Sequence, residues 1–271
     1  MEKQNGLSKN RNICELLAPA GSKEAFIAAV ESGADAVYAG GNLFNARINA
    51  HNFELSEIEE AVHFAHKRNV KVYITVNVLI KDEELLEALE YAKNLYEIGV
   101  DAIIVQDIGF ANLVRKHLPG FELHMSTQAS VFDKDGVFQA MELGFSRVVP
   151  ARELSLAEIE TLCKETPCEI EVFCHGAICV CYSGQCQMSR YIGGRSGNRG
   201  GCAQPCRLPY KSAEGNGKTK ETALLSPSDM SMIDHLDKLC EAGVRSLKIE
   251  GRMKSPEYVA VVTSIYRKYL D

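Results

Sequence analysis

Short apolar runs recur along the chain, and each follows a glycine that is positioned to end a helix. The phrase Ser-Gly-Ala-Asp-Ala-Val-Tyr-Ala-Gly, which begins at Ser32, has counterparts that begin at Ile98, Leu143 and Ala242. A glycine in the left-handed conformation ends each helix, a small or charged residue turns the chain, and the apolar run forms a strand buried on both faces. The pattern therefore predicts repeated units of helix followed by strand.

Reading all such units predicts eight strands, which fall over residues 14–18, 36–39, 71–76, 102–105, 122–125, 147–150, 169–173 and 246–249. Amphipathic helices fill the intervals. Residues 56–67 and 82–97 are examples, because apolar residues recur there at spacings of three and four and acidic residues occupy the first turn. Eight strands that alternate with helices in 271 residues favour an α/β fold, a parallel (β/α)8 TIM-like barrel, over an open doubly wound sheet.

The stretch after the seventh predicted strand departs from this pattern. From Gly176 to about Thr222 it is rich in glycine, arginine and polar residues, which predicts a long ordered loop rather than a separate folded domain. Because it directly follows strand seven, it should lie over the C-terminal mouth, where barrels of this type place their chemistry. We expect a flexible N-terminal tail over residues 1–12 and a single barrel domain over 13–271, with a metal-binding loop insertion over 176–222.

Four cysteines fall within this insertion at the spacing Cys-x6-Cys-x15-Cys-x3-Cys: Cys179, Cys186, Cys202 and Cys206. Their thiolates could form a tetrahedral site for an iron-sulfur cluster or for zinc, because both prefer sulfur ligands. Structural zinc favours tighter Cys-x2-Cys pairs than the first gap here, but spacing alone leaves zinc open. Cys174 and Cys181 lie nearby and are either bystanders or substitute ligands.

Composition narrows the class of protein. No apolar run is long enough to cross a membrane, and the opening residues are polar rather than a signal-peptide core, so we expect a cytoplasmic protein with no membrane partner. Ten cysteines in a reducing compartment indicate metal or redox chemistry before disulfides. The chain has neither a His-Glu-x-x-His zinc motif nor a Gly-x-Ser-x-Gly elbow, which argues against ordinary proteolysis.

Positive charge is concentrated around the cysteines, although the whole chain has a formal net charge of -6. Between residues 187 and 220 there are seven basic residues and one acidic residue. This charge either compensates thiolates around a metal centre or binds phosphate, and both explanations stay open. If it binds phosphate, the candidate RNA-binding residues are Arg190, Arg195, Arg199, Arg207 and Lys211.

Polar residues also follow most of the predicted strands and should ring the mouth of the barrel. Some of them could serve only to cap helices or to pair with one another, as Glu250 and Arg252 easily could. As a set they are the best candidates for contact with a substrate. The tentative catalytic residues are Asn77, Gln106, Arg152, His175 and Glu250.

The segment from Glu171 to Ser189, Glu-Val-Phe-Cys-His-Gly-Ala-Ile-Cys-Val-Cys-Tyr-Ser-Gly-Gln-Cys-Gln-Met-Ser, resembles the signature of peptidase family U32, the collagenase-like peptidase family. Three other stretches are similar to landmarks of that family. They are Glu-Leu-Leu-Ala-Pro-Ala-Gly-Ser from Glu15, Gly-Cys-Ala-Gln-Pro-Cys-Arg from Gly201, and Leu-Lys-Ile-Glu-Gly-Arg-Met-Lys-Ser-Pro from Leu247. The resemblance covers about residues 14–270.

The resemblance implies a chemistry that differs from the family's name. Members with four matching cysteines are implied to hold a 4Fe-4S cluster and to hydroxylate nucleobases or quinone precursors without molecular oxygen. The Cys-x3-Cys pair at Cys202 and Cys206 resembles the RNA-modifying branches. The implied function is thus prephenate-dependent hydroxylation of a tRNA wobble uridine to 5-hydroxyuridine, with the four cysteines as cluster ligands. Arg152, Arg252 or Lys248 could hold the carboxylates of prephenate by charge-assisted hydrogen bonds.

Two alternatives stay open beside this implied function. One is a U32 peptidase of the collagenase-like type, and the other is a non-catalytic, zinc-stabilised RNA-binding module. Many relatives continue past the barrel into a small β-rich C-terminal extension that is absent from this sequence. We expect that the extension is dispensable or that a lost segment or a second polypeptide supplies it.

Overall fold

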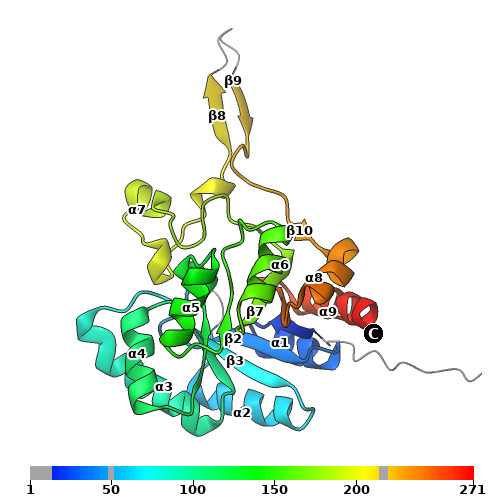
Figure 1. Ribbon diagram of the computed structural model, residues 1–271. Coiled ribbons are helices and arrows are strands. Elements are labelled where there is room, and N and C mark those ends of the chain that lie inside the picture. The colour runs from blue at the N-terminus through cyan, green and yellow to red at the C-terminus, as the bar shows by residue number, and fades with distance from the viewer. Residues whose placement is uncertain (1–13, 48–51, 214–218) are drawn as a thin grey trace, which may run out of the picture.

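The structure is a computed structural model, and it describes residues 14–47, 52–213 and 219–271 (Figure 1). The tail expected over residues 1–12 lies outside the described residues. In the part of the chain that is described, no helix is both long and apolar enough to cross a membrane.

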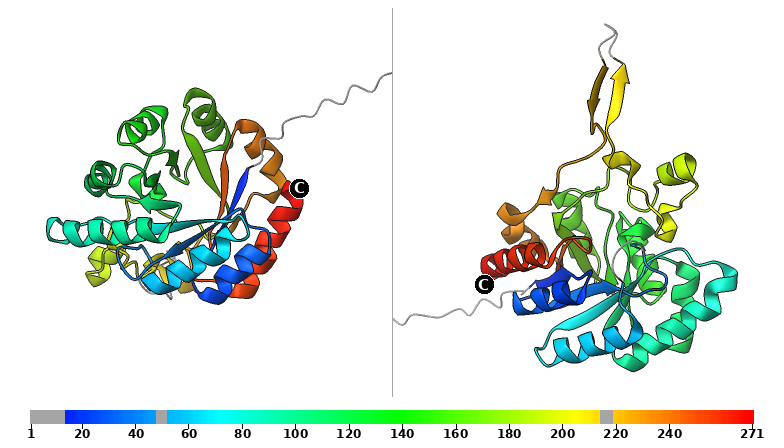
Figure 2. Two further views of the ribbon diagram at one scale, coloured as in Figure 1. Left: turned by 90° about the horizontal axis from the view of Figure 1, so that it is seen from below. Right: turned by 180° about the vertical axis from the view of Figure 1, so that it is seen from behind.

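Eight parallel strands among the described residues close into a barrel with helices around its outside (Figures 1 and 2). Neighbouring strands pair in the order β7-β11-β1-β2-β3-β4-β5-β6, and β6 pairs again with β7 to complete the ring. This confirms the predicted TIM barrel. The strands are β1 (Glu15–Pro19), β2 (Ala36–Gly40), β3 (Lys71–Val76), β4 (Ala102–Val105), β5 (Glu122–Met125), β6 (Arg147–Val148), β7 (Glu169–Gly176) and β11 (Ser246–Ile249).

Helices alternate with these strands, and side chains at their first turns explain where several of them begin. The side chains of Ser22, Asp107 and Ser155 each accept a hydrogen bond from a backbone N–H in the first turn of the following helix. The predicted helix over residues 56–67 is shifted by one residue, and residues 82–97 form a 3-10 turn followed by a helix. The helices are α1 (Lys23–Glu31), α2 (Leu55–His66), α3 (Leu85–Ile98), α4 (Ile108–His117), α5 (Lys134–Glu142), α6 (Leu156–Glu165), α8 (Leu236–Ala242) and α9 (Pro256–Leu270).

Two strands differ from their predictions by two or more residues in length. The sixth was expected over residues 147–150 but ends at Val148, just before Pro150, which has no N–H to donate to a neighbouring strand. The seventh was expected to end at Phe173 but continues to Gly176, because a short strand, β10 (Met230–Ser231), pairs with its end in the antiparallel direction.

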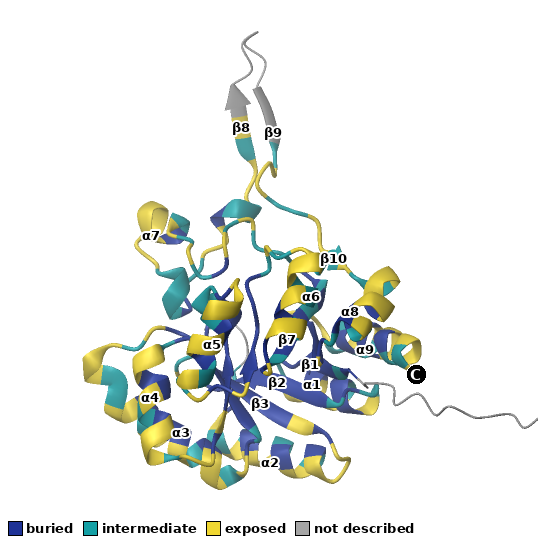
Figure 3. Ribbon diagram, in the orientation of Figure 1, coloured by how far each residue is buried: buried dark blue, intermediate teal, exposed yellow. Residues whose placement is uncertain are grey.

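The segment between β7 and β10 lies over one end of the barrel and is more regular than the loop expected over residues 176–222 (Figure 1). It contains a helix, α7 (Met188–Gly193), and two 3-10 turns. A two-stranded hairpin, β8 (Tyr210–Ala213) with β9 (Thr219–Thr222), projects away from the barrel. In this hairpin Lys211 is exposed and Tyr210 and Thr222 are half-buried, whereas the barrel strands are mostly buried (Figure 3).

The apolar core divides at the wall of the barrel. Most of the buried apolar side chains pack between the strands and the surrounding helices. Inside the barrel the apolar cluster is small, and its members are Leu17, Ala36, Tyr38, Tyr73, Ala102 and Ile104. Charged groups therefore occupy part of an interior that branched apolar residues usually fill.

Arg147, the first residue of β6, is a buried cation whose side chain is 4% exposed. Its guanidinium group lies 2.6 Å from the Glu15 carboxylate, 2.7 Å from Glu169 and 3.2 Å from Glu171. The other oxygen of the Glu171 carboxylate accepts a hydrogen bond from the Lys248 ammonium group at 2.8 Å. These ion pairs join β1, β6, β7 and β11 from the inside.

Electrostatics determine the charge state of Glu171, whose side chain is fully buried. Burial alone would raise the pKa of its carboxyl group, but the positive charges of Lys248 and Arg147 outweigh it and lower that pKa to about 2. The group is therefore ionised at neutral pH. Because its folded pKa is below its ordinary value of 4.5, its contribution to stability is complete above that pH and is lost as the pH falls toward about 2.

We predict that Glu171→Gln lowers the free energy of unfolding by about 3 to 5 kcal/mol, because it leaves two buried cations without their shared carboxylate. Urea denaturation at neutral pH measures this change. The control is Glu165→Gln, which breaks an exposed pair with Lys134 and should cost no more than about 1 kcal/mol. Equal effects of the two substitutions would show that the buried network is not a principal source of stability.

Candidate active site at the barrel mouth

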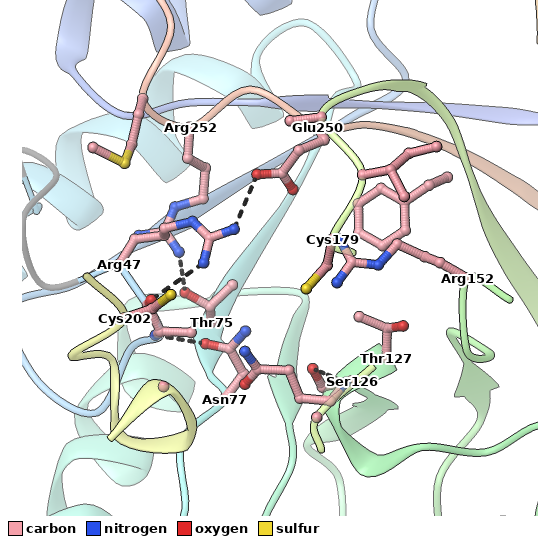
Figure 4. Close-up of a pocket in the computed structure, with 18 of the residues that line it drawn as sticks. Arg47, Thr75, Asn77, Ser126, Thr127, Arg152, Cys179, Cys202, Glu250 and Arg252 are labelled. Atoms are coloured by element: carbon pink, nitrogen blue, oxygen red, sulfur yellow. Dashed lines mark hydrogen bonds and ion pairs between the residues drawn. The ribbon is translucent and has the colours of Figure 1, made fainter. Parts of the chain in front are cut away.

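A cavity of about 550 Å³ opens at the carboxyl ends of the barrel strands, beneath the segment that follows β7 (Figure 4). Side chains from the ends of β2, β3, β7 and β11, and from the loops after β5 and β6, form its walls. Residues between 177 and 207 form its opposite side. The cavity therefore lies where TIM barrels carry their chemistry.

Arg252 is a buried cation in this cavity and is 5% exposed. Its guanidinium group donates to Thr75 Oγ1 and Asn45 Oδ1, each at 3.1 Å, and to Asn52 Oδ1 at 3.3 Å. Gly40 leaves room for it, because a Cβ there would lie 2.1 Å from Arg252 Nη2. Among the described residues no carboxylate lies within ion-pair distance of this group, and burial lowers the pKa of Arg252 to about 10. Because the neutral oxygens do not cancel the positive charge of Arg252, the site can bind an anion.

Two further arginines face the same space from opposite walls (Figure 4). Arg47 Nη2 lies 3.4 Å from the Glu250 carboxylate. Arg152 lies over the Phe173 ring at 5.3 Å, and its buried Nε has no hydrogen-bond partner among the described residues. Burial alone would raise the pKa of Glu250, but Arg47, Arg152 and Arg252 outweigh it and the net shift is downward. Glu250 is therefore a carboxylate that offsets part of the positive charge.

Cations outnumber carboxylates in the lining of the cavity. The basic lining residues are Arg47, Arg152, Arg207, Lys248, Arg252 and Lys254, and the acidic ones are Asp229 and Glu250. Lys248 is already paired with Glu171 beneath the cavity. The remaining excess of positive charge suits a small molecule that carries carboxylate groups.

The four cysteines of the expected ligand set, Cys179, Cys186, Cys202 and Cys206, all line this cavity, whereas Cys181 does not. Burial and the neighbouring Cys179 thiol raise the pKa of Cys206. The Cys202 sulfur accepts hydrogen bonds from the Gln204 N–H at 3.4 Å and from the Ser189 hydroxyl at 3.8 Å. The cavity is thus lined by soft sulfur donors, one of which is held by two hydrogen bonds.

This donor set fits a thiolate-bound metal in its chemistry. Four cysteines suit iron-sulfur clusters and zinc alike, and donors to a ligating sulfur are typical of cluster sites. In the described parts of the chain, no three histidine, cysteine or acidic side chains converge closely enough to hold a metal ion as they stand. The cysteines therefore share one cavity without forming a closed coordination sphere.

The residues expected to be catalytic are divided between the cavity and its surroundings. Asn77, Arg152 and Glu250 line it, and Asn77 Oδ1 accepts a hydrogen bond from the Ala46 N–H. Gln106 does not line it but lies buried behind it, donating to the Gln128 carbonyl at 3.3 Å. The structure brings three of the five together at the mouth.

His175, like Gln106, does not line the cavity, and its side chain packs against α9 instead. The register between β7 and β11 shifts at this point, so that Lys248 is opposite Phe173 but Ile249 is opposite His175. The imidazole packs edge-on against the Tyr266 ring of α9, with Nδ1 3.3 Å from its hydroxyl. This bulge corrects the expectation that His175 belongs to the ring of polar residues around the mouth.

The five basic residues expected to bind RNA also separate into two groups. Arg199 forms an ion pair with Glu84 at 2.6 Å, and Arg207 donates to Ile178 O, Ser226 Oγ and Pro227 O. Arg199 thus attaches the segment to the loop after β3 and the turn before α3, whereas Arg207 joins the beginning of the segment to its end. The exposed ones are Arg190, Arg195 and Lys211.

Sequence reasoning missed the contribution of the loop that follows β2. Asn45, Arg47 and Asn52 come from this loop and either line the cavity or hold Arg252 in it. The position of the loop after a barrel strand was the available signal, since such loops meet at the C-terminal mouth. The sequence does not indicate which polar side chains of this loop point into the cavity.

The model of the family described as Peptidase family U32 matches residues 21–271. The 23S rRNA 5-hydroxycytidine synthase of Escherichia coli (strain K12) is 46% identical over 261 residues, which is 95% of this chain and 39% of that protein. The tRNA hydroxylation protein P1 of Bacillus subtilis (strain 168) is 43% identical over 265 residues, 95% of this chain and 63% of that protein. The chain thus spans less than two thirds of the length of either relative.

A relative with a different name is the collagenase of Porphyromonas gingivalis, which is 33% identical over 282 residues, 97% of this chain and 66% of that protein. Among solved structures, that of a U32 peptidase superposes with a TM-score of 0.58 at 14% identity and covers 93% of this chain and 96% of its own. At that identity the similarity supports the fold alone.

Proposed function

The chain belongs to peptidase family U32, and from that membership and the geometry of the cavity we propose that it hydroxylates a base of RNA. The proposed reaction converts a tRNA wobble uridine to 5-hydroxyuridine without molecular oxygen, with a 4Fe-4S cluster as cofactor and prephenate as co-substrate. One observation carries the proposal: in a chain whose relatives include proteins named for RNA hydroxylation, four cysteines line a cavity rich in cations.

The proposed cofactor would be held by the thiolates of Cys179, Cys186, Cys202 and Cys206. When bound, a 4Fe-4S cluster supplies electron transfer at the edge of the cavity. The hydrogen bonds to the Cys202 sulfur would stabilise the thiolate charge and tune that chemistry.

The proposed co-substrate would bind through its carboxylates to the arginines of the wall. Arg252 is fixed by three neutral oxygens and has no carboxylate partner in the described part of the chain, so a carboxylate of the co-substrate would supply the opposite charge. On the other side of the cavity, Arg152 Nε has no hydrogen-bond partner among the residues that the structure describes and could donate to the co-substrate. The Arg47 guanidinium group lies near both the Glu250 carboxylate and Cys202 (Figure 4).

The target base would be recognised by the loop after β5. Gln128 lines the cavity, and its buried Oε1 has no hydrogen-bond partner among the described residues. An amide oxygen without a donor is suited to accept the N3–H of uracil. A wobble base in a single-stranded loop is inexpensive to extrude into such a cavity, and Arg190, Arg195 and Lys211 would hold the adjacent phosphates.

A peptidase of the collagenase-like type is the second candidate, because one relative carries that name. A cysteine protease needs a thiolate beside a histidine that takes its proton. Here the adjacent pair does not serve: Cys174 is fully buried, burial raises its pKa, and His175 packs against Tyr266. This geometry favours the hydroxylase.

We predict that the protein purified without oxygen has broad visible absorption with near-equal iron and sulfide, and that it adds about 16 mass units to a tRNA uridine in the presence of prephenate. Cys202→Ser should lose the absorption and the product, whereas Cys181→Ser, whose sulfur is outside the cavity lining, should keep both. Absorption spectra, metal analysis and mass spectrometry of nucleosides measure these outcomes. A colourless protein with stoichiometric zinc would contradict the assignment.

We predict that Arg252→Met raises the KM for prephenate about 10-fold to 100-fold, because it removes charge-assisted hydrogen bonds to a carboxylate. Arg152→Met should act in the same direction. The cluster spectrum should be unchanged in both, which separates a binding defect from loss of the cofactor. Lys268→Met, an exposed substitution on α9, is the control. If KM stays constant in both arginine variants, neither residue binds the co-substrate.

We predict that the double change of Arg190 and Arg195 to Glu weakens tRNA binding and reduces the slope of log affinity against log salt by about 2, because each residue neutralises about one phosphate. Filter binding over a salt series measures both quantities. Lys67→Glu, at the end of α2 on the opposite face of the barrel, should leave them unchanged. If the affinity of the wild type for tRNA does not change with salt concentration, this surface does not bind the phosphates.

A further inference from the structure

Tyr182 lies at the rim of the cavity, between the first two cysteines of the proposed ligand set. Its side chain contributes to the lining of the cavity, and yet the residue is 72% exposed. It makes no hydrogen bond or ring contact with other side chains among the described residues. An exposed aromatic ring without intramolecular partners, placed at the entrance to a site, is available to a ligand.

The backbone beside this ring is held firmly. Ser183 is 1% exposed, and its N–H donates to Glu153 Oε1 at 2.7 Å while its carbonyl accepts from the Ser130 hydroxyl at 2.5 Å. The Arg152 N–H donates to the Ser183 hydroxyl at 3.3 Å. The loops after β5 and β6 therefore fix the position of the residue that follows Tyr182.

The next residue, Gly184, adds a steric constraint. It has a φ of 76°, and a Cβ on it would lie 2.0 Å from the Gln128 carbonyl oxygen, so that only glycine allows this approach. Gln128 is the residue proposed to face the target base. The turn that presents the Tyr182 ring therefore packs directly on the residue that would recognise the base.

We propose that the Tyr182 ring is a stacking platform for an RNA base that enters the mouth or lies next to the one that does. This inference rests on the proposed function. A rigid side chain with two torsions loses little entropy on binding, and a base of any sequence can stack on its face. The cations around the mouth bind phosphate and carboxylate, whereas this ring supplies the flat apolar surface that a base requires.

The chain has no tryptophan, which makes a direct test possible. Tyr182→Trp introduces a single indole at the rim and keeps a stacking surface. We expect its fluorescence to be quenched when an unmodified tRNA transcript binds. The matched control is Tyr269→Trp, because Tyr269 is 65% exposed near the end of α9, away from the mouth. Its fluorescence should not change.

Binding of the same transcript provides the second readout. Tyr182→Ala should weaken it about 10-fold, Tyr182→Phe should preserve it because the ring remains, and Tyr269→Ala should have no effect. The platform would be overturned if the wild type binds the transcript in a salt-dependent way, Tyr182→Ala binds it equally well, and the indole of Tyr182→Trp is not quenched. These results would leave the proposed function standing. Absence of tRNA binding by the wild type would overturn both.

Discussion

The buried ion pairs around Glu171 are the constraint on which the barrel and its mouth both depend. Arg147, Glu15 and Glu171 meet inside a ring of strands whose apolar interior is small. Charges in such a place are stable only when each has its partner, so the strands that carry them must keep their register. Lys248 extends the network upward to the cavity, where its charge is already matched.

At the bottom of the cavity the charge of Lys248 is cancelled by Glu171, whereas the walls carry a net positive charge. Arg47, Arg152 and Arg252 supply the walls from three different loops, and the neighbouring carboxylate of Glu250 does not balance them. An anion that enters would bind at the sides, which leaves the centre for the reacting group. Gly40 leaves space for the Arg252 guanidinium group, and the oxygens around that group accept its hydrogen bonds, so its buried position is supported by the surrounding structure.

Much of this architecture could be predicted from the sequence, because four of the eight strands follow a local signal of glycine, turn and apolar run and the others fit the same alternation of strand and helix. The four cysteines could be grouped for the same reason, since they occur in one segment. The inward direction of Arg47 and the rotation of His175 could not, because they depend on a loop conformation and on a register shift between β7 and β11. The structural roles of Arg199 and Arg207 likewise depend on partners that are distant along the chain.

The cysteine-bearing segment was expected to be a metal-binding loop, and it also has numerous contacts within the protein. Arg199 bonds to Glu84 and the Leu79 carbonyl, and Arg207 bonds to three groups near the two ends of the segment. These anchors lie on both sides of the cysteines and involve no sulfur. Contacts of the protein itself therefore help to hold the segment over the mouth. If the segment binds the proposed cofactor, these contacts would let it keep its path when the cofactor is absent.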